Sequence, residues 1–124
     1  MPNKIKIITE KVKKIAILND SPMAKALWSF LPFEAFVNRW GEEIYFSIPL
    51  KEIEGEKKKV VNKGDIAFWP LGRTFCIFFG PTPTSTGKEI RPASEVILLG
   101  KIVGDVEEFK KVKDEEKIII DKEI

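Results

Sequence analysis

Alternation of apolar and polar residues is the main pattern along the chain, and it predicts β-strands. It is clearest in segments 42–49 and 74–79, and a strand places two alternating sets of side chains on opposite faces. The apolar sets are Ile44, Phe46 and Ile48, and Phe75, Ile77 and Phe79; the other sets are Glu43, Tyr45 and Ser47, and Thr74, Cys76 and Phe78. We expect the apolar sets to face the core and the others to face a groove or solvent.

Other short runs rich in Ile, Val and Phe have the length and flanking residues of strands. The predicted strands are 4–9, 11–18, 33–38, 42–49, 66–69, 74–79, 95–103 and 117–121, and the first two read as a hairpin. The longest stretch without periodicity is 80–94, which contains three prolines and two glycines. Because long loops in compact domains are often functional or mobile, we single this one out.

Helical spacing replaces the alternation in segment 22–31. Ser21 can cap the first free N–H groups, and Pro22 suits the first helical position. The apolar residues that follow lie on one face of a helix, and Pro32 ends it. These apolar residues are Met23, Leu27, Phe30 and Leu31.

A second short helix is predicted over 105–111, where Asp105 and Glu108 have the spacing of a capping box. About eight strands with two short helices favour a mainly β fold, a closed barrel whose ends the helices cover. Closure removes the exposed edges that a flat sheet would leave. The 124 residues form one predicted domain, 1–124, without repeat or linker.

Composition narrows the cellular setting. A single cysteine excludes an internal disulfide, and no apolar run approaches the ~20 residues of a membrane-spanning helix, so we expect a cytoplasmic protein without a membrane partner. Net charge is +2, lysines alternate with acidic residues and arginines are few, so a nucleic-acid partner is not expected. The absence of His and Gln beside abundant Lys and Glu is typical of hyperthermophiles.

Residues for common catalytic chemistry are missing. Without histidine, no Ser/His or Cys/His pair and no zinc site can form, and no phosphate-binding glycine motif occurs, so we expect no metal and no cofactor. Glu42 and Glu43 would point to opposite faces of a strand and cannot act as a pair. Cys76 lies in an apolar strand with no basic neighbour, which predicts a packed, inert thiol.

Three aromatic residues allow two interpretations. Trp40, Tyr45 and Trp69 can pack at the rim of the barrel. They can also form a platform for a proline or a peptide, because aromatic faces offer large, rigid contact areas at low entropic cost. The sequence pattern is compatible with both.

Four segments of the chain form a recognisable set of motifs: V-N-R-W-G-E-E-I-Y-F at 37–46, G-D-I-A-F-W-P-L-G at 64–72, C-I-F-F-G-P-T-P-T-S at 76–85 and R-P-A-S at 91–94. In these motifs the chain resembles a small prokaryotic family of cyclophilin-like single-domain proteins. The segment L-G-K-I-V-G-D at 99–105 also resembles a segment of the peptidyl-prolyl isomerases called cyclophilins. The resemblance implies a closed cyclophilin-like barrel.

By position, the resemblance places Arg39 where cyclophilins carry their catalytic arginine. Tyr45, Ser47, Thr74 and Cys76 replace groove residues, and Ser47 stands in place of a glutamine. The large Trp69 takes the place of a small groove residue and would crowd a proline pocket. Arg39 can instead pair with a nearby acid such as Glu43.

These observations favour a non-catalytic binding module for a peptide or a small molecule. The ligand would lie over Tyr45, Trp69 and Phe78, and Arg39 would contact a carbonyl or carboxylate. The alternatives are a weak prolyl isomerase using Arg39, and an accessory subunit of a larger enzyme; a homo-oligomer is compatible with each. The predicted binding residues are Arg39, Glu43, Tyr45, Ser47, Trp69, Thr74, Cys76 and Phe78.

Overall fold

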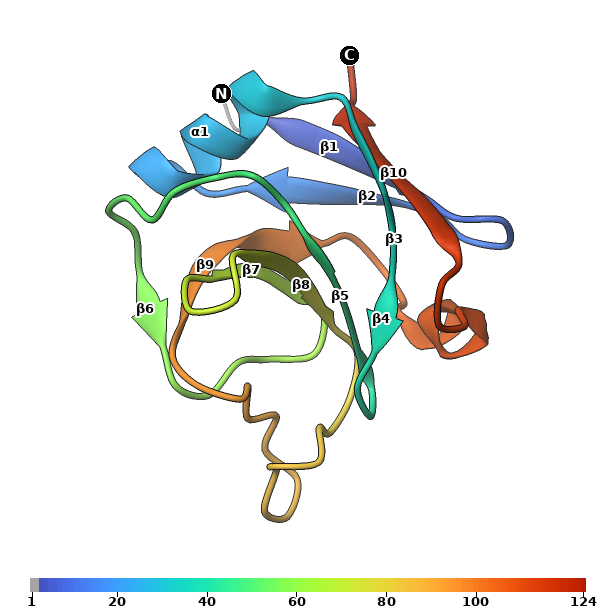
Figure 1. Cartoon of the computed structure of the whole chain (residues 1–124). Coiled ribbons are helices and arrows are strands. Elements are labelled where there is room, and N and C mark those ends of the chain that lie inside the picture. Colours follow the sequence, from blue (N-terminus) through green and yellow to red (C-terminus); the bar gives the residue numbers. More distant parts are fainter. Residues whose placement is uncertain (1–2) are drawn as a thin grey trace.

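An antiparallel sheet of ten strands curls into a barrel in the computed structural model, which describes residues 3–124 (Figure 1). The strands are β1 (Lys4–Ile8), β2 (Lys13–Leu18), β3 (Phe33–Phe36), β4 (Asn38–Arg39), β5 (Glu43–Ser47), β6 (Lys57–Lys58), β7 (Asp65–Trp69), β8 (Thr74–Phe78), β9 (Val96–Ile102) and β10 (Lys117–Lys122). The helices are α1 (Pro22–Phe30) and the 3-10 helix η1 (Glu107–Lys111).

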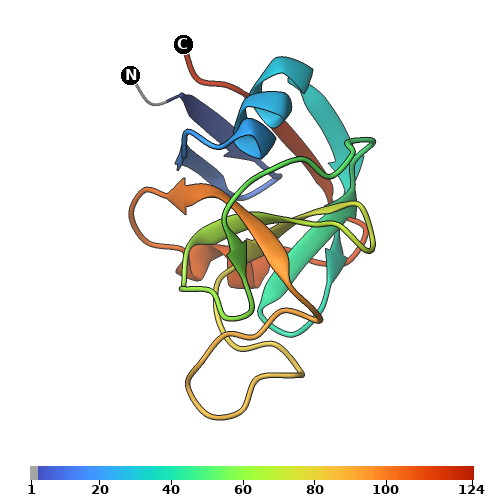
Figure 2. The ribbon, with the colours of Figure 1, turned by 90° about the vertical axis from the view of Figure 1, so that its left-hand side faces the viewer.

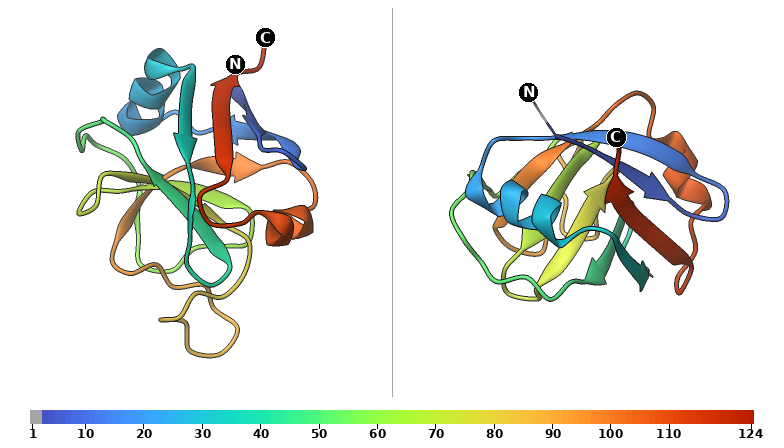
Figure 3. Two further views of the ribbon diagram at one scale, coloured as in Figure 1. Left: turned by 45° about the vertical axis from the view of Figure 1, so that its right-hand side comes forward. Right: turned by 90° about the horizontal axis from the view of Figure 1, so that it is seen from above.

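One extended segment, 33–39, closes the barrel. The strands follow the order β3-β10-β1-β2-β9-β7-β8-β5-β4, and β6 pairs with β9 outside this path. β3 pairs with β10 and β4 pairs with β5, so consecutive parts of the same segment hold the two ends of the order together (Figure 3). The sequence predicts a mainly β, closed barrel of about eight strands, and the nearly closed barrel of the structure confirms this fold class.

Helix α1 lies across one end of the barrel, as predicted (Figure 3). The Ser21 hydroxyl accepts a hydrogen bond from the Ala24 N–H, and Pro22 occupies the first turn. Met23, Ala24 and Leu27 are buried in the main core. Their burial fixes the helix to the barrel, since a nine-residue helix is marginal alone.

The second helix differs from the prediction. It is a 3-10 turn over Glu107–Lys111 with no side-chain cap, so the capping box was wrong. The Asp105 carboxylate accepts from the Glu107 N–H at 3.0 Å, a local turn bond that replaces the expected cap. Phe109 of this helix is buried in the main core, and its ring stacks on Phe79 with the ring centroids 6.0 Å apart.

Both faces of β8 are buried, and the residues that cover its outer face surround the candidate site. The inner face belongs to the main core, whereas Cys76 and Phe78 on the outer face belong to a second apolar cluster. This cluster also contains Val61 and Ile90, which form an isolated bridge. Ile90 belongs to the loop between β8 and β9, which projects from the barrel in Figure 2. The loop therefore covers part of the outer face of the sheet.

Helices able to cross a membrane are absent from the part of the chain that the structure describes, residues 3–124.

Candidate functional site

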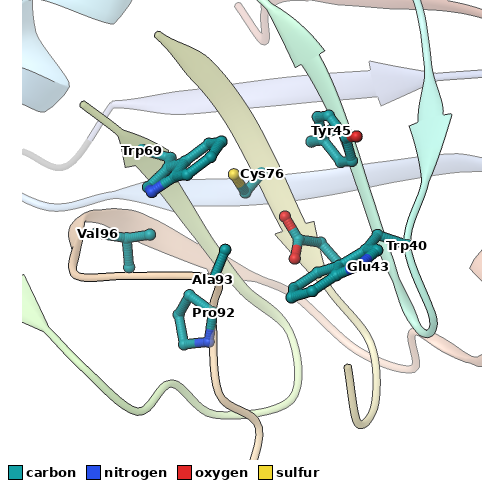
Figure 4. A pocket seen from close by; sticks show the side chains of 8 residues that line it. All are labelled: Trp40, Glu43, Tyr45, Trp69, Cys76, Pro92, Ala93 and Val96. Carbon is teal, nitrogen blue, oxygen red and sulfur yellow. The ribbon is translucent and has the colours of Figure 1, made fainter. Parts of the chain in front are cut away.

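A pocket of about 270 Å³ opens on the outer face of the barrel, beside the second apolar cluster. Strands β5, β7, β8 and β9 supply most of its wall, and the turn before β5 and the loop before β9 complete it (Figure 4). Its lining residues are Trp40, Glu43, Tyr45, Trp69, Cys76, Pro92, Ala93 and Val96.

Strand register explains why side chains distant in sequence meet here. Tyr45 on β5 lies directly opposite Cys76 on β8, and Cys76 lies opposite Ala67 on β7. Residues two apart on a strand share a face, so Glu43 and Trp69 point outward with Tyr45 and Cys76. Figure 4 shows these side chains around a common hollow, with Trp69 on one side and Tyr45 and Glu43 on the other.

Two local structures hold the tryptophans. Trp40 lies in the tight turn between β4 and β5, where its N–H and carbonyl both bond the backbone of Glu43. This turn needs Gly41, whose φ of +63° is costly for other residues and whose missing Cβ leaves room for Pro83. The Trp69 indole N–H donates to the hydroxyl of Ser94. The loop is thereby tied to β7 next to the pocket.

Glu43 is the one carboxyl group among the described residues that line the pocket. Its side chain is buried, with 5% of the residue exposed. Desolvation raises the pKa of the Glu43 carboxyl to about 7, and a hydrogen bond from Cys76 offsets part of this rise. Among residues 3–124, no lysine or arginine forms an ion pair with Glu43 or lines the pocket.

Cys76 remains a thiol at neutral pH. Burial, and then the charge of Glu43, raise the pKa of Cys76 well above its ordinary value. A thiolate is needed for nucleophilic attack and metal binding, and this environment opposes it. Within residues 3–124, no cluster of carboxylates and thiols suited to a metal ion occurs. The site can therefore bind ligands through aromatic contact and one carboxyl group, which accepts when ionised and donates when neutral.

Four of the predicted binding residues line the pocket, and three others from the same strands do not. Ser47 is exposed at the end of β5, beyond the pocket. Thr74 is buried, and its hydroxyl lies 3.4 Å from the Cys76 sulfur. Phe78 is fully buried within the second cluster. The four lining residues are Glu43, Tyr45, Trp69 and Cys76.

Arg39 lies outside the pocket. It pairs with Ile44 across the β4–β5 ladder, so its side chain is on the core side of the sheet. Its guanidinium donates to the carbonyls of Gly41, Lys110 and Val112 at 3.0, 2.8 and 3.1 Å and lies 5.2 Å from the centroid of Phe79. The alternative considered from the sequence, an ion pair between Arg39 and Glu43, is not formed, because the two side chains leave the sheet on opposite faces.

Sequence reasoning missed part of the wall. The sequence suggests Trp40 as part of an aromatic platform but does not include it among the predicted binding residues. Those residues also lack Pro92, Ala93 and Val96, which line the pocket. Val96 lies at the start of β9. The alternation of that strand predicts which face of the sheet Val96 is on, but not which residues of other strands lie beside it. Pro92 and Ala93 belong to the motif R-P-A-S, whose sequence shows neither the strand nor the helix periodicity. Only the way the loop folds brings these two residues into the wall of the pocket.

Comparison with known proteins agrees with this architecture. The family model described as "Cyclophilin-like" matches residues 3–121. The solution structure of a hypothetical protein from Archaeoglobus fulgidus is similar at a TM-score of 0.83 and 36% identity, covering 98% of this chain and 95% of that chain. No match was found among the curated proteins. The family model and the neighbour each cover nearly the whole chain, and the chain therefore belongs to the cyclophilin-like family.

Proposed function

We propose that this protein is a non-catalytic binding module and that it holds a small molecule or a single side chain of a peptide in the pocket. The observation that carries the proposal is an apolar pocket with one convergent carboxyl group, Glu43, on a rigid four-stranded wall. Binding sites are typically apolar hollows with a few placed polar groups. A volume of about 270 Å³ is below the usual range for drug-sized ligands, so the occupant is small.

The alternative of prolyl isomerase activity has less support. It depends on Arg39, and that guanidinium is engaged by three backbone carbonyls on the core side of the sheet.

The test is a fragment screen by NMR with neutral, cationic and anionic compounds. We expect fragments to shift the indole signals of Trp40 and Trp69. Ala93 is exposed at the pocket wall, so Ala93→Phe fills the pocket without disturbing the core and abolishes these shifts. The control Ser29→Phe adds the same ring to an exposed position on α1 and leaves them unchanged. Absence of any fragment that binds the parent but not Ala93→Phe contradicts the proposal.

A further inference from the structure

Three aromatic residues surround the buried carboxylate in the pocket. Trp40 comes from the turn, Tyr45 from β5 and Trp69 from β7, and in Figure 4 their side chains lie around Glu43 and Cys76. Aromatic faces carry a negative potential that attracts cations, most strongly when the cation is desolvated. An ionised Glu43 adds a full negative charge to the same hollow.

Within residues 3–124, no positively charged side chain forms an ion pair with Glu43. Elsewhere on the surface the carboxylates pair with lysines, as Glu42 does with Lys110 at 3.7 Å. Glu43 has no such partner among the described residues, and its carboxyl is directed into the pocket (Figure 4). A buried charge is costly unless it is paired, so a cationic ligand would offset the cost of an ionised Glu43 in the pocket.

The type of cation follows from hydrogen bonding. A primary ammonium brings three N–H donors, and each needs an acceptor once buried. The lining offers the Glu43 carboxylate and otherwise mainly aromatic and aliphatic surface, including Pro92, Ala93 and Val96. A quaternary ammonium has no donors and an apolar surface of methyl groups. It gains from the rings and the charge without bringing any buried donor that would be left unsatisfied.

We propose that the pocket recognises a quaternary ammonium group, carried by a free small molecule or by a trimethylated lysine. This inference rests on the proposed binding function and assigns its ligand class. Trp40, Tyr45 and Trp69 contact the methyl groups, and Glu43 supplies the opposite charge.

Binding of this kind depends on pH with a definite sign. The other titratable groups that face Glu43 are Tyr45 from its own strand and Cys76 from β8; β7, β9 and the loop contribute Trp69, Val96, Pro92 and Ala93, which do not titrate. Cys76 stays neutral because its pKa is raised. Affinity for a cation therefore rises as pH passes upward through the pKa of Glu43, about 7. A ligand that accepts a hydrogen bond from the neutral carboxyl shows the opposite trend.

The experiment compares choline with 3,3-dimethylbutan-1-ol, its uncharged isostere, by NMR titration of the Trp40 and Trp69 indole signals. At about pH 8 we expect choline to bind at least about tenfold more tightly than the alcohol. Between about pH 8 and pH 5.5 the choline affinity should fall about tenfold while that of the alcohol stays constant. A peptide with trimethyllysine, beside its unmethylated form, distinguishes a side-chain ligand from a free one.

Two variants assign the effect to its residue. Glu43→Gln keeps the shape of the side chain, removes the charge, and should reduce choline affinity about tenfold and abolish its pH dependence. Glu42→Gln makes the same change outside the pocket and should leave the choline affinity and its pH dependence unchanged. The pH titration of the parent needs no variant, so it tests whether an ionised carboxyl binds choline even if Glu43→Gln folds poorly.

Equal affinity for choline and the alcohol overturns the inference, as does choline affinity that rises toward acid pH. Absence of choline and trimethyllysine binding also overturns it. The binding function is decided separately, since neutral or anionic fragments that bind the parent but not Ala93→Phe uphold it while this ligand class fails.

Discussion

At the scale of single residues, Glu43 combines a cost to folding with the role in ligand binding proposed above. The alternation of β5 directs its side chain to the outer face, and the loop that packs there removes it from water. A carboxyl buried in this way holds its charge poorly, which raises the pKa of Glu43, and the hydrogen bond from Cys76 offsets only part of this rise. Groups shifted toward neutral pH in a hollow are frequent at functional sites.

This cost makes the stability of the fold depend on pH. Glu43 binds its proton more tightly in the folded protein, with a pKa of about 7 against 4.5, than in the unfolded chain. The folded state is therefore favoured fully below pH 4.5 and loses this contribution as pH rises to 7. Over that window the free energy of unfolding should fall by about 3 kcal/mol through this group.

The Glu43→Gln variant tests this dependence by urea unfolding across the same range. Glutamine does not ionise, so the stability of the variant relative to the parent should increase with pH by about 3 kcal/mol. Glu42→Gln, which removes an exposed ion pair, provides the baseline and should show no such trend. A constant difference between the Glu43→Gln variant and the parent contradicts the raised pKa.

At the scale of elements, the sequence predicts the strands and their sidedness well because these depend on local alternation. Ile44 and Ile77 face the core and Tyr45 and Cys76 face outward, as the period of two requires. The strand β6 at Lys57–Lys58 escapes this reasoning, because two lysines carry no apolar signal and its pairing with β9 is decided by tertiary contact.

Only half of the candidate binding set was predictable from the strands, and the reason is physical. The pocket exists because the loop between β8 and β9 folds back, through the Trp69–Ser94 hydrogen bond and the Val61–Ile90 bridge. Such contacts join residues that are distant in sequence and leave no periodic pattern. The sequence also could not show that β4 turns Arg39 inward, since a two-residue strand has no alternation to read.

Arg39 links two elements and is expected to act in stability. Its guanidinium joins the β4–β5 turn to the C-terminal end of η1 through the carbonyls of Gly41, Lys110 and Val112. Arg39→Ala should lower the free energy of unfolding by about 2 kcal/mol, because the carbonyls lose charged donors and Phe79 loses its cation. Urea unfolding measures this loss.

Lysine should restore little of that stability, since its single ammonium cannot reproduce the planar fork that reaches separate carbonyls. Lys111→Ala, at an exposed position of η1, serves as the matched control and should change stability by less than about 0.5 kcal/mol. Choline and fragment binding should survive in Arg39→Ala. An unchanged stability, or a loss of ligand binding, is the result that contradicts this assignment.

At the scale of the whole molecule, the barrel encloses the main core and carries the candidate pocket on its outer face. The same strands serve both, since β5, β7 and β8 bury their inner faces in the main cluster and present their outer faces to the pocket. A family fold of this kind does not transfer an activity, because activity depends on the side chains placed on it. Here Arg39 belongs to the inner side and the aromatic residues to the outer side.

The whole molecule is accordingly expected to give negligible acceleration of X–Pro isomerisation. The uncatalysed barrier is ~20 kcal/mol, and each tenfold in rate requires ~1.4 kcal/mol of stabilisation specific to the twisted amide. That stabilisation needs oriented donors beside a proline pocket. Arg39 is held by backbone carbonyls, Ser47 is exposed outside the pocket, and the Trp69 N–H is bound to Ser94.

An NMR exchange assay on an X–Pro peptide measures this, with an active cyclophilin as the positive control. The parent and Arg39→Ala should both match the uncatalysed rate, because removing an arginine that never reaches the peptide changes nothing in catalysis. Trp69→Ala enlarges the hollow and should still not accelerate exchange, since it adds space but no donor. A parent that accelerates exchange by orders of magnitude, together with loss of that activity in Arg39→Ala, would assign the protein to the isomerases and remove the basis for a purely binding role.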